Sequence, residues 1–343
     1  MTASNPIGAA LSICAGLMLG AFALPMKKVK VWGWEHTWLI FSLIALIVMP
    51  FIMAFVTIPD LPAVWAETNP RVLLAVAGFA ALWGFASITY GLGVKLAGLA
   101  IANSIILGLN SAIGSILPII LYSPDRFLTG QGIGVTVAVA VMIAGIIMCA
   151  RAGFLRDRNR AQQSGEKEQA VKSDAKKGLL ICFASGILGS SFNFAMINGK
   201  PIERIAVAHG ASPSYATNAT WPVALTAGCL VAVVYCLFLM IKNKNGRDFL
   251  AARTGINWLY SFLMALLWYG GVMVYGIAVT KLGELGASIG WAILQSVTVA
   301  TGVGLGFVTG EWKGAVRKIS RLLLVGLVVL IMGIVIVVSV GTV

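Results

Sequence analysis

Uncharged hydrogen-bonding side chains and aromatic rings are the groups in this sequence whose types and spacing could do chemistry. Seven of them lie inside long apolar runs: Tyr90, Asn103, Asn110, Asn193, Trp268, Trp291 and Gln295. Amides donate and accept hydrogen bonds with hydroxyl groups, and an aromatic face can cover the C–H face of a sugar ring. We therefore predict that these residues bind a small neutral polyol or sugar. The alternative for each asparagine is a helix-to-helix hydrogen bond without any ligand.

Charged groups are missing from the middle of every apolar run. No Asp, Glu, Lys, Arg or His falls near the centre of an expected membrane span, whereas a buried ionic substrate normally needs an opposite charge close by. The sequence also has no GxxxxGK[ST] phosphate loop, no HExxH motif and no paired carboxylates placed for hydrolysis. We expect a protein that is not an enzyme and that has no cofactor and no metal site.

Continuous apolar segments predict an all-α integral membrane protein. Of the 343 residues, 59% are hydrophobic and 11% are charged. A hydrocarbon core of about 30 Å is crossed by about 20 helical residues, and the runs do not alternate as barrel strands do. Ten transmembrane helices are predicted, near 6–26, 36–58, 70–94, 96–122, 131–152, 177–197, 214–241, 256–281, 285–310 and 320–341.

The basic residues predict the orientation of these helices. Twenty of the 25 Lys and Arg residues fall in the odd-numbered connections between helices. Because basic loops stay in the cytoplasm, we expect both termini on the exterior side. The net charge of +13 is then a signal of topology, and no nucleic-acid partner is expected.

A duplication organises the chain. Trp83, Tyr90 and Lys95 correspond to Trp268, Tyr275 and Lys281, with one residue inserted in the second copy. The predicted division is a first five-helix repeat over 1–153, a cytoplasmic linker over 154–177 and a second five-helix repeat over 178–343. Since five is odd, the second repeat enters the membrane from the opposite side. Inverted repeats of this kind are typical of secondary transporters, which alternate access to a site at the midplane.

Five motifs occur in order along the chain: PMKKVKVWGWEHTW at 25–38, LWGFASITYGL at 82–92, NFAMINGKP at 193–201, LLWYGG at 266–271 and GEWK at 310–313. Together they resemble the L-rhamnose–proton symporter family of the drug/metabolite transporter superfamily. The similarity runs over nearly the whole chain, and PMKKVKxWxWE is its most specific part. The resemblance implies a bacterial inner-membrane protein and proton-coupled uptake of L-rhamnose or a related deoxyhexose or pentose. In that membrane, the exterior side on which the basic residues place both termini is the periplasm.

Proton coupling, if the resemblance holds, needs a titratable group. A carboxylate in a poorly solvated position can bind a proton near neutral pH. The candidates near helix ends are Glu35 and Glu284. We predict Glu35, because it belongs to the WxWE motif and is followed by His36. Two alternatives stay open, namely simple placement of Glu35 at a helix N-terminus and passive transport of the substrate.

Other functions also stay open at this level. The protein could carry another small metabolite or a lipid-linked substrate, as other members of the superfamily do, or it could be a non-transporting membrane scaffold. The expected partners are a small neutral sugar, a proton and the lipid bilayer. The helices near 131–152 and 320–341 have few polar groups, so they are candidates for scaffold or for a homodimer surface.

Overall fold

Helices account for all the regular structure in the described part of the chain. The structure is a computed structural model that describes residues 6–97, 99–163, 175–283, 285–310, 312–313 and 315–341. Ten of its helical segments are long and apolar enough to cross a membrane. This confirms the predicted all-α integral membrane fold.

The spanning elements are α1 (Pro6–Ala21), continued by the 3₁₀ turn η1 (Pro25–Lys28); α2 (Trp34–Leu43), η2 (Ile44–Val48) and α3 (Met49–Thr57) in one span; α5 (Pro70–Ala97); α6 (Leu99–Tyr122); α8 (Gly130–Gln163); α9 (Ala175–Asn198); α11 (Trp221–Asn243); α12 (Gly255–Leu282); α13 (Gly286–Val308); and α14 (Arg317–Gly341). Shorter elements join them, namely α4 (Leu61–Glu67), α7 (Pro124–Phe127), α10 (Lys200–Ala208), η3 (Ala216–Ala219) and η4 (Gly246–Leu250).

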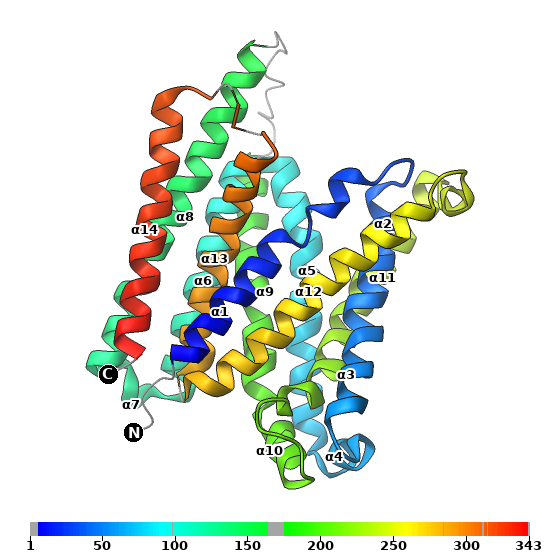
Figure 1. Cartoon of the computed structure of the whole chain (residues 1–343), viewed down its shortest axis with the longest axis vertical. Helices are drawn as coiled ribbons and strands as arrows, with labels where there is room; N and C mark the ends of the chain where they lie inside the picture. The colour runs from blue at the N-terminus through cyan, green and yellow to red at the C-terminus, as the bar shows by residue number, and fades with distance from the viewer. Residues whose placement is uncertain are drawn as a thin grey trace.

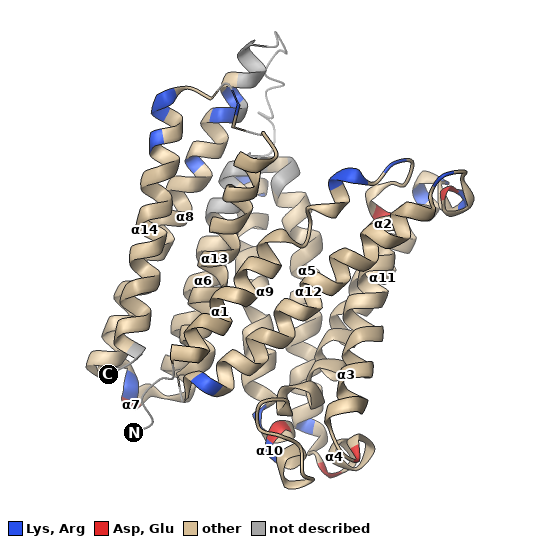
Figure 2. Cartoon of the chain, in the orientation of Figure 1, with Lys and Arg blue, Asp and Glu red and all other residues tan. Residues whose placement is uncertain are grey.

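The two ends of the helix bundle differ in charge. The start of α1 and the end of α14 lie together with α4, α7 and α10 at one end, which we call the termini end (Figure 1). η1 and η4 lie at the opposite end, which we call the basic end. Most of the described Lys and Arg residues are at the basic end, and few are at the termini end (Figure 2). The predicted one-sided distribution of basic residues is therefore present in the folded chain.

The helices pack as a layered bundle. α8 and α14 lie side by side at one edge, and the spans α2–α3 and α11 lie at the other edge (Figure 1). Between the edges, α9 packs against both α5 and α6, while α1 packs against both α12 and α13. α6 and α13 also contact each other. The helices that carry the predicted binding residues thus occupy the middle of the bundle.

Two prolines show how local sequence shapes the spans. Pro50 lies in the first turn of α3, directly after the wider π-helical turn η2. Proline cannot donate a backbone hydrogen bond, and the change of helix type lets the span continue past it. Pro222 lies in the first turn of α11, which begins at Trp221, and a 3₁₀ turn replaces the helical residues predicted from 214. Proline suits a first helical turn because that N–H has no intrahelical acceptor.

The predicted linker is helical over its first part. α8 does not end near residue 152 but continues to Gln163. A polar continuation of this kind is compatible with helix because its Arg, Gln and Ala residues are good helix formers. Residues 164–174 of the linker, and Glu284, lie outside the described residues.

Candidate functional site

Two tryptophans stack at the centre of the bundle. Trp83 lies midway along α5 and Trp268 lies midway along α12, and their ring centroids are 5.7 Å apart with an interplanar angle of 26°. The sequence comparison of the two halves had matched these same two residues. Gly228 of α11 lets Trp83 pack closely, since a Cβ there would lie 2.8 Å from a ring carbon of Trp83.

Phe192 of α9 joins this pair to two further indoles. Its ring contacts Trp83 at 5.0 Å and Trp268 at 6.4 Å between centroids. On its other sides it stacks on Trp221 at 5.7 Å and on Trp291 at 5.9 Å. Sequence reasoning did not identify Phe192, because a single phenylalanine in an apolar helix carries no distinguishing pattern. The centre of the protein is therefore aromatic and uncharged.

Asn193 is the hub of a hydrogen-bond network on the termini side of these rings. Its side-chain amide donates to the carbonyl of Gly114 at 2.7 Å and to that of Ala287 at 3.3 Å. The hydroxyl of Tyr275 donates to Asn193 Oδ1 at 3.0 Å. Both side chains are fully buried. We call these four residues the Asn193 network; it ties α9 to α6, α12 and α13.

Trp291 is locked next to this network. Its indole Nε1 donates to the backbone carbonyl of Asn110 at 3.1 Å. The ring lies directly over Gly114, where a Cβ would be 2.3 Å from Nε1. The side chain of Asn110 is placed differently, because its Oδ1 is buried and has no hydrogen-bond partner among the described residues. Asn110 therefore has unused hydrogen-bonding capacity, whereas Asn193 and Trp291 are already paired.

The remaining predicted site residues are spread toward the basic end. Tyr90 is half-buried on α5 and lies two helical turns from Trp83, near Cys182 of α9. Gln295 is half-buried on α13, one turn beyond Trp291. Asn103 lies on α6 about two turns from Asn110, and its side chain lies outside the described residues. The structure thus brings Trp268, Trp291, Asn110 and Asn193 together but does not gather all seven residues.

The two ends of the site differ in how tightly they are packed. On α9, residues 189–196 are all buried, which means that protein surrounds two full turns of this helix. On α13, residues 286–297 are buried except for Ala287 and Gln295, whereas residues 298–305 are half-buried or exposed. The path from the central tryptophans is therefore closed by packing at the termini end.

Glu35, in the first turn of α2, is held at the basic end by the last residue of α11 and the loop that follows it, an arrangement that we call the loop clamp. Its Oε1 accepts hydrogen bonds from the side-chain amides of Asn243 at 2.9 Å and Asn245 at 2.5 Å. The neighbouring His36 donates from Nε2 to the carbonyl of Asn245 at 2.9 Å. Nearby, Asn257 in the first turn of α12 donates to the carbonyl of Lys30 at 2.8 Å. The PMKKVKVWGWEH motif therefore has a structural use in this clamp.

Metal ligands do not cluster in the described part of the chain. No group of three or more His, Cys, Asp or Glu residues there could hold a metal ion. The cysteines described are free, and Cys149, Cys182, Cys229 and Cys236 are buried. The chemistry that the centre can do is accordingly recognition by hydrogen bonds and by aromatic faces.

Known proteins resemble this chain over nearly its full length. Residues 4–342 match the family described as L-rhamnose-proton symport protein (RhaT). The chain is 31% identical over 332 residues to the L-rhamnose-proton symporter of Citrobacter koseri, a match that covers 95% of this chain and 93% of the relative. The L-rhamnose-proton symporters of Salmonella paratyphi B and Salmonella newport match with the same identity and coverage.

Proposed function

Because the chain belongs to the L-rhamnose-proton symport protein family, we propose that it imports L-rhamnose, or a related deoxyhexose or pentose, together with a proton. The protein is a multi-pass membrane transporter and not an enzyme. The motif-based resemblance to this family is confirmed. Membership does not favour the scaffold or the lipid-linked substrate.

We infer a neutral sugar because the centre of the helix bundle is uncharged and aromatic. A deoxyhexose has an apolar face made of C–H groups and a methyl group, and it has hydroxyls around its edge. The Trp83 and Trp268 rings suit the apolar face, and amides suit the hydroxyls. An ionic substrate would be left there without an opposite charge, which is costly in a poorly solvated site.

The predicted site residues divide into two groups in this proposal. Trp268, Asn110 and Gln295 face the sugar, and Tyr90 lines its way toward the basic end. Asn103, whose side chain lies outside the described residues, stays a predicted binding residue on α6. Asn193 and Trp291 support the site from the termini side, because their polar groups are engaged by the protein itself. For Asn193 the sequence had left helix-to-helix bonding open, and the hydrogen bonds favour that interpretation.

The helix packing supports two inverted five-helix repeats with a two-fold axis through the centre. Under this relation α1 corresponds to α9, α5 to α12 and α6 to α13. The contacts of α9 with α5 and α6 then correspond to those of α1 with α12 and α13, and all four are present. Residues on such an axis meet their own counterparts, as Trp83 and Trp268 do. Rocking of one repeat against the other would alternate access to the central rings.

The basic end is the cytoplasmic end in this proposal, because Lys and Arg residues are retained on that side. Both termini then lie in the periplasm, and the membrane is the bacterial inner membrane. The packing described above leaves the periplasmic side closed in this conformation. α14 exposes apolar side chains along its length, including Leu324, Val328 and Val335, and lipid or a second copy of the chain would cover them.

Transport assays in proteoliposomes test the proposal directly. We expect saturable uptake of labelled L-rhamnose, competition by related deoxyhexoses and pentoses, and no uptake of an amino acid. Addition of rhamnose should make the medium outside the vesicles more alkaline, since protons enter with the sugar. Saturable uptake of the amino acid without response to any sugar would contradict the proposal.

The substitution Asn110→Ala should weaken rhamnose binding roughly 5- to 150-fold, because loss of one buried hydrogen bond costs about 1–3 kcal/mol. Binding is measured by quenching of the central tryptophans in purified protein. Asn198→Ala is the matched control, because Asn198 is also an asparagine but bonds Tyr122 at the termini end of α9. Unchanged affinity in Asn110→Ala, combined with a lower melting temperature, would assign Asn110 to helix packing instead.

A further inference from the structure

Glu203 is a buried carboxylate that sequence reasoning did not single out. It lies in the first turn of α10, just past the termini end of α9, and it is 5% exposed. Of the acidic residues whose side chains the structure describes, only Glu203 and Glu35 are buried. Asp60, Glu67 and Asp125 are exposed, and Asp248 is half-buried. A carboxylate that carries protons in a transport cycle must leave bulk water, so these two are the candidates.

The two buried carboxylates differ in their partners. Glu35 accepts two hydrogen bonds from amides that are built into the loop clamp. Those donors stabilise the ionised carboxylate and hold it in place. Glu203 accepts one charged hydrogen bond, from Lys200 Nζ to Oε2 at 2.8 Å. Its other oxygen, Oε1, is buried without a partner among the described residues.

This arrangement opposes two effects on the protonation of the Glu203 carboxyl group. A buried carboxylate with only one partner is costly to keep ionised, while the ammonium of Lys200 favours the ionised form. Lys200 is able to leave, because 36% of its side chain is exposed. Binding of a proton to the carboxylate would break the ion pair and free the ammonium into water, and loss of the proton would restore the pair.

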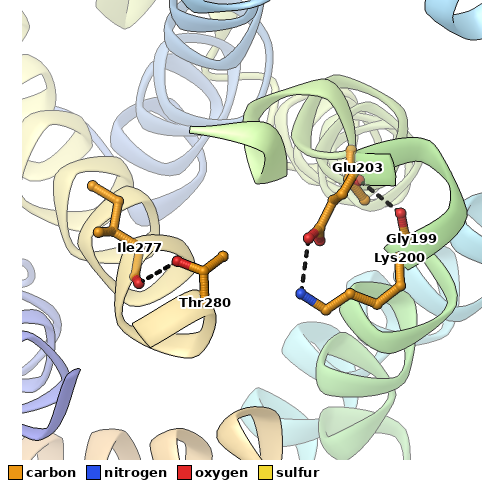
Figure 3. Close-up of polar contacts among 6 residues, drawn as sticks. Gly199, Lys200, Glu203, Ile277 and Thr280 are labelled. Carbon is orange, nitrogen blue, oxygen red and sulfur yellow. Dashed lines mark hydrogen bonds and ion pairs between the residues drawn. The ribbon is translucent and has the colours of Figure 1, made fainter. Parts of the chain in front are cut away.

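The pair lies on the way out of the central site. Figure 3 shows Lys200 and Glu203 on α10 facing the end of α12, where Thr280 donates to the carbonyl of Ile277 in its own helix at 2.7 Å. Thr280 is five residues beyond Tyr275 of the Asn193 network. Going outward along α9 and α12, the network comes first and the ion pair follows. Glu203 is therefore placed between that network and the exterior.

We propose that Glu203 is the proton-binding carboxylate of the transport cycle and that its ion pair with Lys200 sets its proton affinity. This inference rests on the proposed proton symport. Protons load from the periplasm when the termini end is open, and this breaks the ion pair with Lys200. The proton then leaves toward the cytoplasm and the pair re-forms, as it is in the closed conformation described above. Glu35 then serves the loop clamp, in place of the coupling role predicted for it from the sequence.

Few charged groups among the described residues lie near Glu203. On its own helix they are Lys200 and Arg204, and farther along α10 His209 pairs with Glu67 of α4 at 3.0 Å. α12 brings Lys281 at its end. α9 has lysines only at its opposite end, and η3 has no charged residue. Cations therefore outnumber anions near the carboxylate, and the proton must compete with Lys200.

The decisive comparison is Glu203→Gln against Glu35→Gln and the exposed control Glu67→Gln, all in proteoliposomes. Each substitution keeps the shape of the side chain and removes the titration. Glu203→Gln should keep exchange of labelled for unlabelled rhamnose but lose accumulation driven by a pH gradient, so that inside and outside concentrations become equal. Glu67→Gln and Glu35→Gln should still accumulate sugar. Accumulation by Glu203→Gln at the level of the parent, or its loss only in Glu35→Gln, would overturn the proposal.

A second variant covers the case in which Glu203→Gln does not fold. Lys200→Gln removes the cation that favours the ionised carboxylate, so the pH dependence of coupled uptake should shift toward alkaline pH, and Lys200→Arg should keep the parental profile. The protonated carboxyl band in infrared spectra, recorded without sugar at different pH values, should shift in the same direction. An unshifted profile and an unshifted band in Lys200→Gln would each contradict the role of the pair. If the parent protein exchanges no rhamnose, the proposed substrate fails, while the infrared titration still tests Glu203.

Discussion

Gly114→Ala is expected to lower the free energy of unfolding by about 2–4 kcal/mol and to abolish high-affinity sugar binding. The new methyl group would lie 2.3 Å from Nε1 of Trp291, far inside van der Waals contact. The indole must move, which breaks its hydrogen bond to the Asn110 carbonyl. The same movement disturbs the carbonyl of Gly114 that Asn193 uses. The added methyl group therefore disturbs both the Asn193 network and the central aromatic rings.

Gly108→Ala is the matched control for this substitution. Gly108 lies on the same helix, and its added Cβ would meet only a carbon of Ile143 at 3.7 Å, an ordinary contact. Alanine favours helix over glycine by about 1 kcal/mol, so this variant should be as stable as the parent or slightly more stable. Melting curves followed by tryptophan fluorescence and rhamnose binding measure both effects. Equal melting temperatures for the two variants would show that the ring of Trp291 can be accommodated beside a methyl group at position 114.

The fold was predictable because the membrane imposes a strong rule on sequence. A span needs about 20 apolar residues whose backbone bonds are satisfied internally, and each of the ten expected spans has a counterpart in the structure. The pairing of Trp83 with Trp268 could also be anticipated, since both occupy the same place in the duplicated segment. Boundaries were less predictable where polar residues continue a helix, as they do in α8 beyond the membrane.

The roles of individual polar residues were harder to predict because they depend on partners far away in sequence. Asn193 and Asn110 look alike in the sequence, but Asn193 meets Tyr275, which is 82 residues away. Glu35 attracted attention through its motif, yet its amide partners come from the last residue of α11 and the loop after it, 208 and 210 residues away. Glu203 lies in a short surface helix in which a charged residue would ordinarily face water. Its burial follows from the packing of α10 and could not be inferred from α10 alone.

Closure of the termini end depends on contacts between the two halves of the chain. Asn193 of α9, in the second half, donates to the carbonyl of Gly114 of α6, in the first half, and this bond must break if the halves separate at the periplasmic side. Tyr275 of α12 donates to the oxygen of the same Asn193 side chain and thereby holds the amide in place. The tryptophan rings nearby pack through dispersion and can slide, whereas a buried hydrogen bond is either made or broken. The Asn193 network is thus suited to act as a latch with two states, closed in this conformation and open when the site faces outward.

Tyr275→Phe should increase the outward-open population about tenfold, because removal of a hydrogen bond worth about 1.4 kcal/mol from the closed state shifts the equilibrium by that factor. A cysteine at position 87, one turn from Trp83 toward the basic end, reports the opening. In a Cys14→Ser background, a membrane-impermeant maleimide added from the periplasmic side should label Ser87→Cys about tenfold faster when Tyr275 is Phe.

Thr280→Cys is the control for this labelling, since position 280 lies on the exterior side of the network and should react at the same rate with either residue at 275. Asn193→Leu should act in the same direction as Tyr275→Phe but cost more stability, because it also leaves the carbonyl of Gly114 without its donor. A double substitution then shows whether the pair acts as one unit: the labelling rate of Asn193→Leu should not rise further when Tyr275→Phe is added. If Tyr275→Phe lowers the melting temperature but leaves the labelling rate unchanged, the bond serves packing only, and closure of the termini end must come from the apolar contacts of α9 and α13.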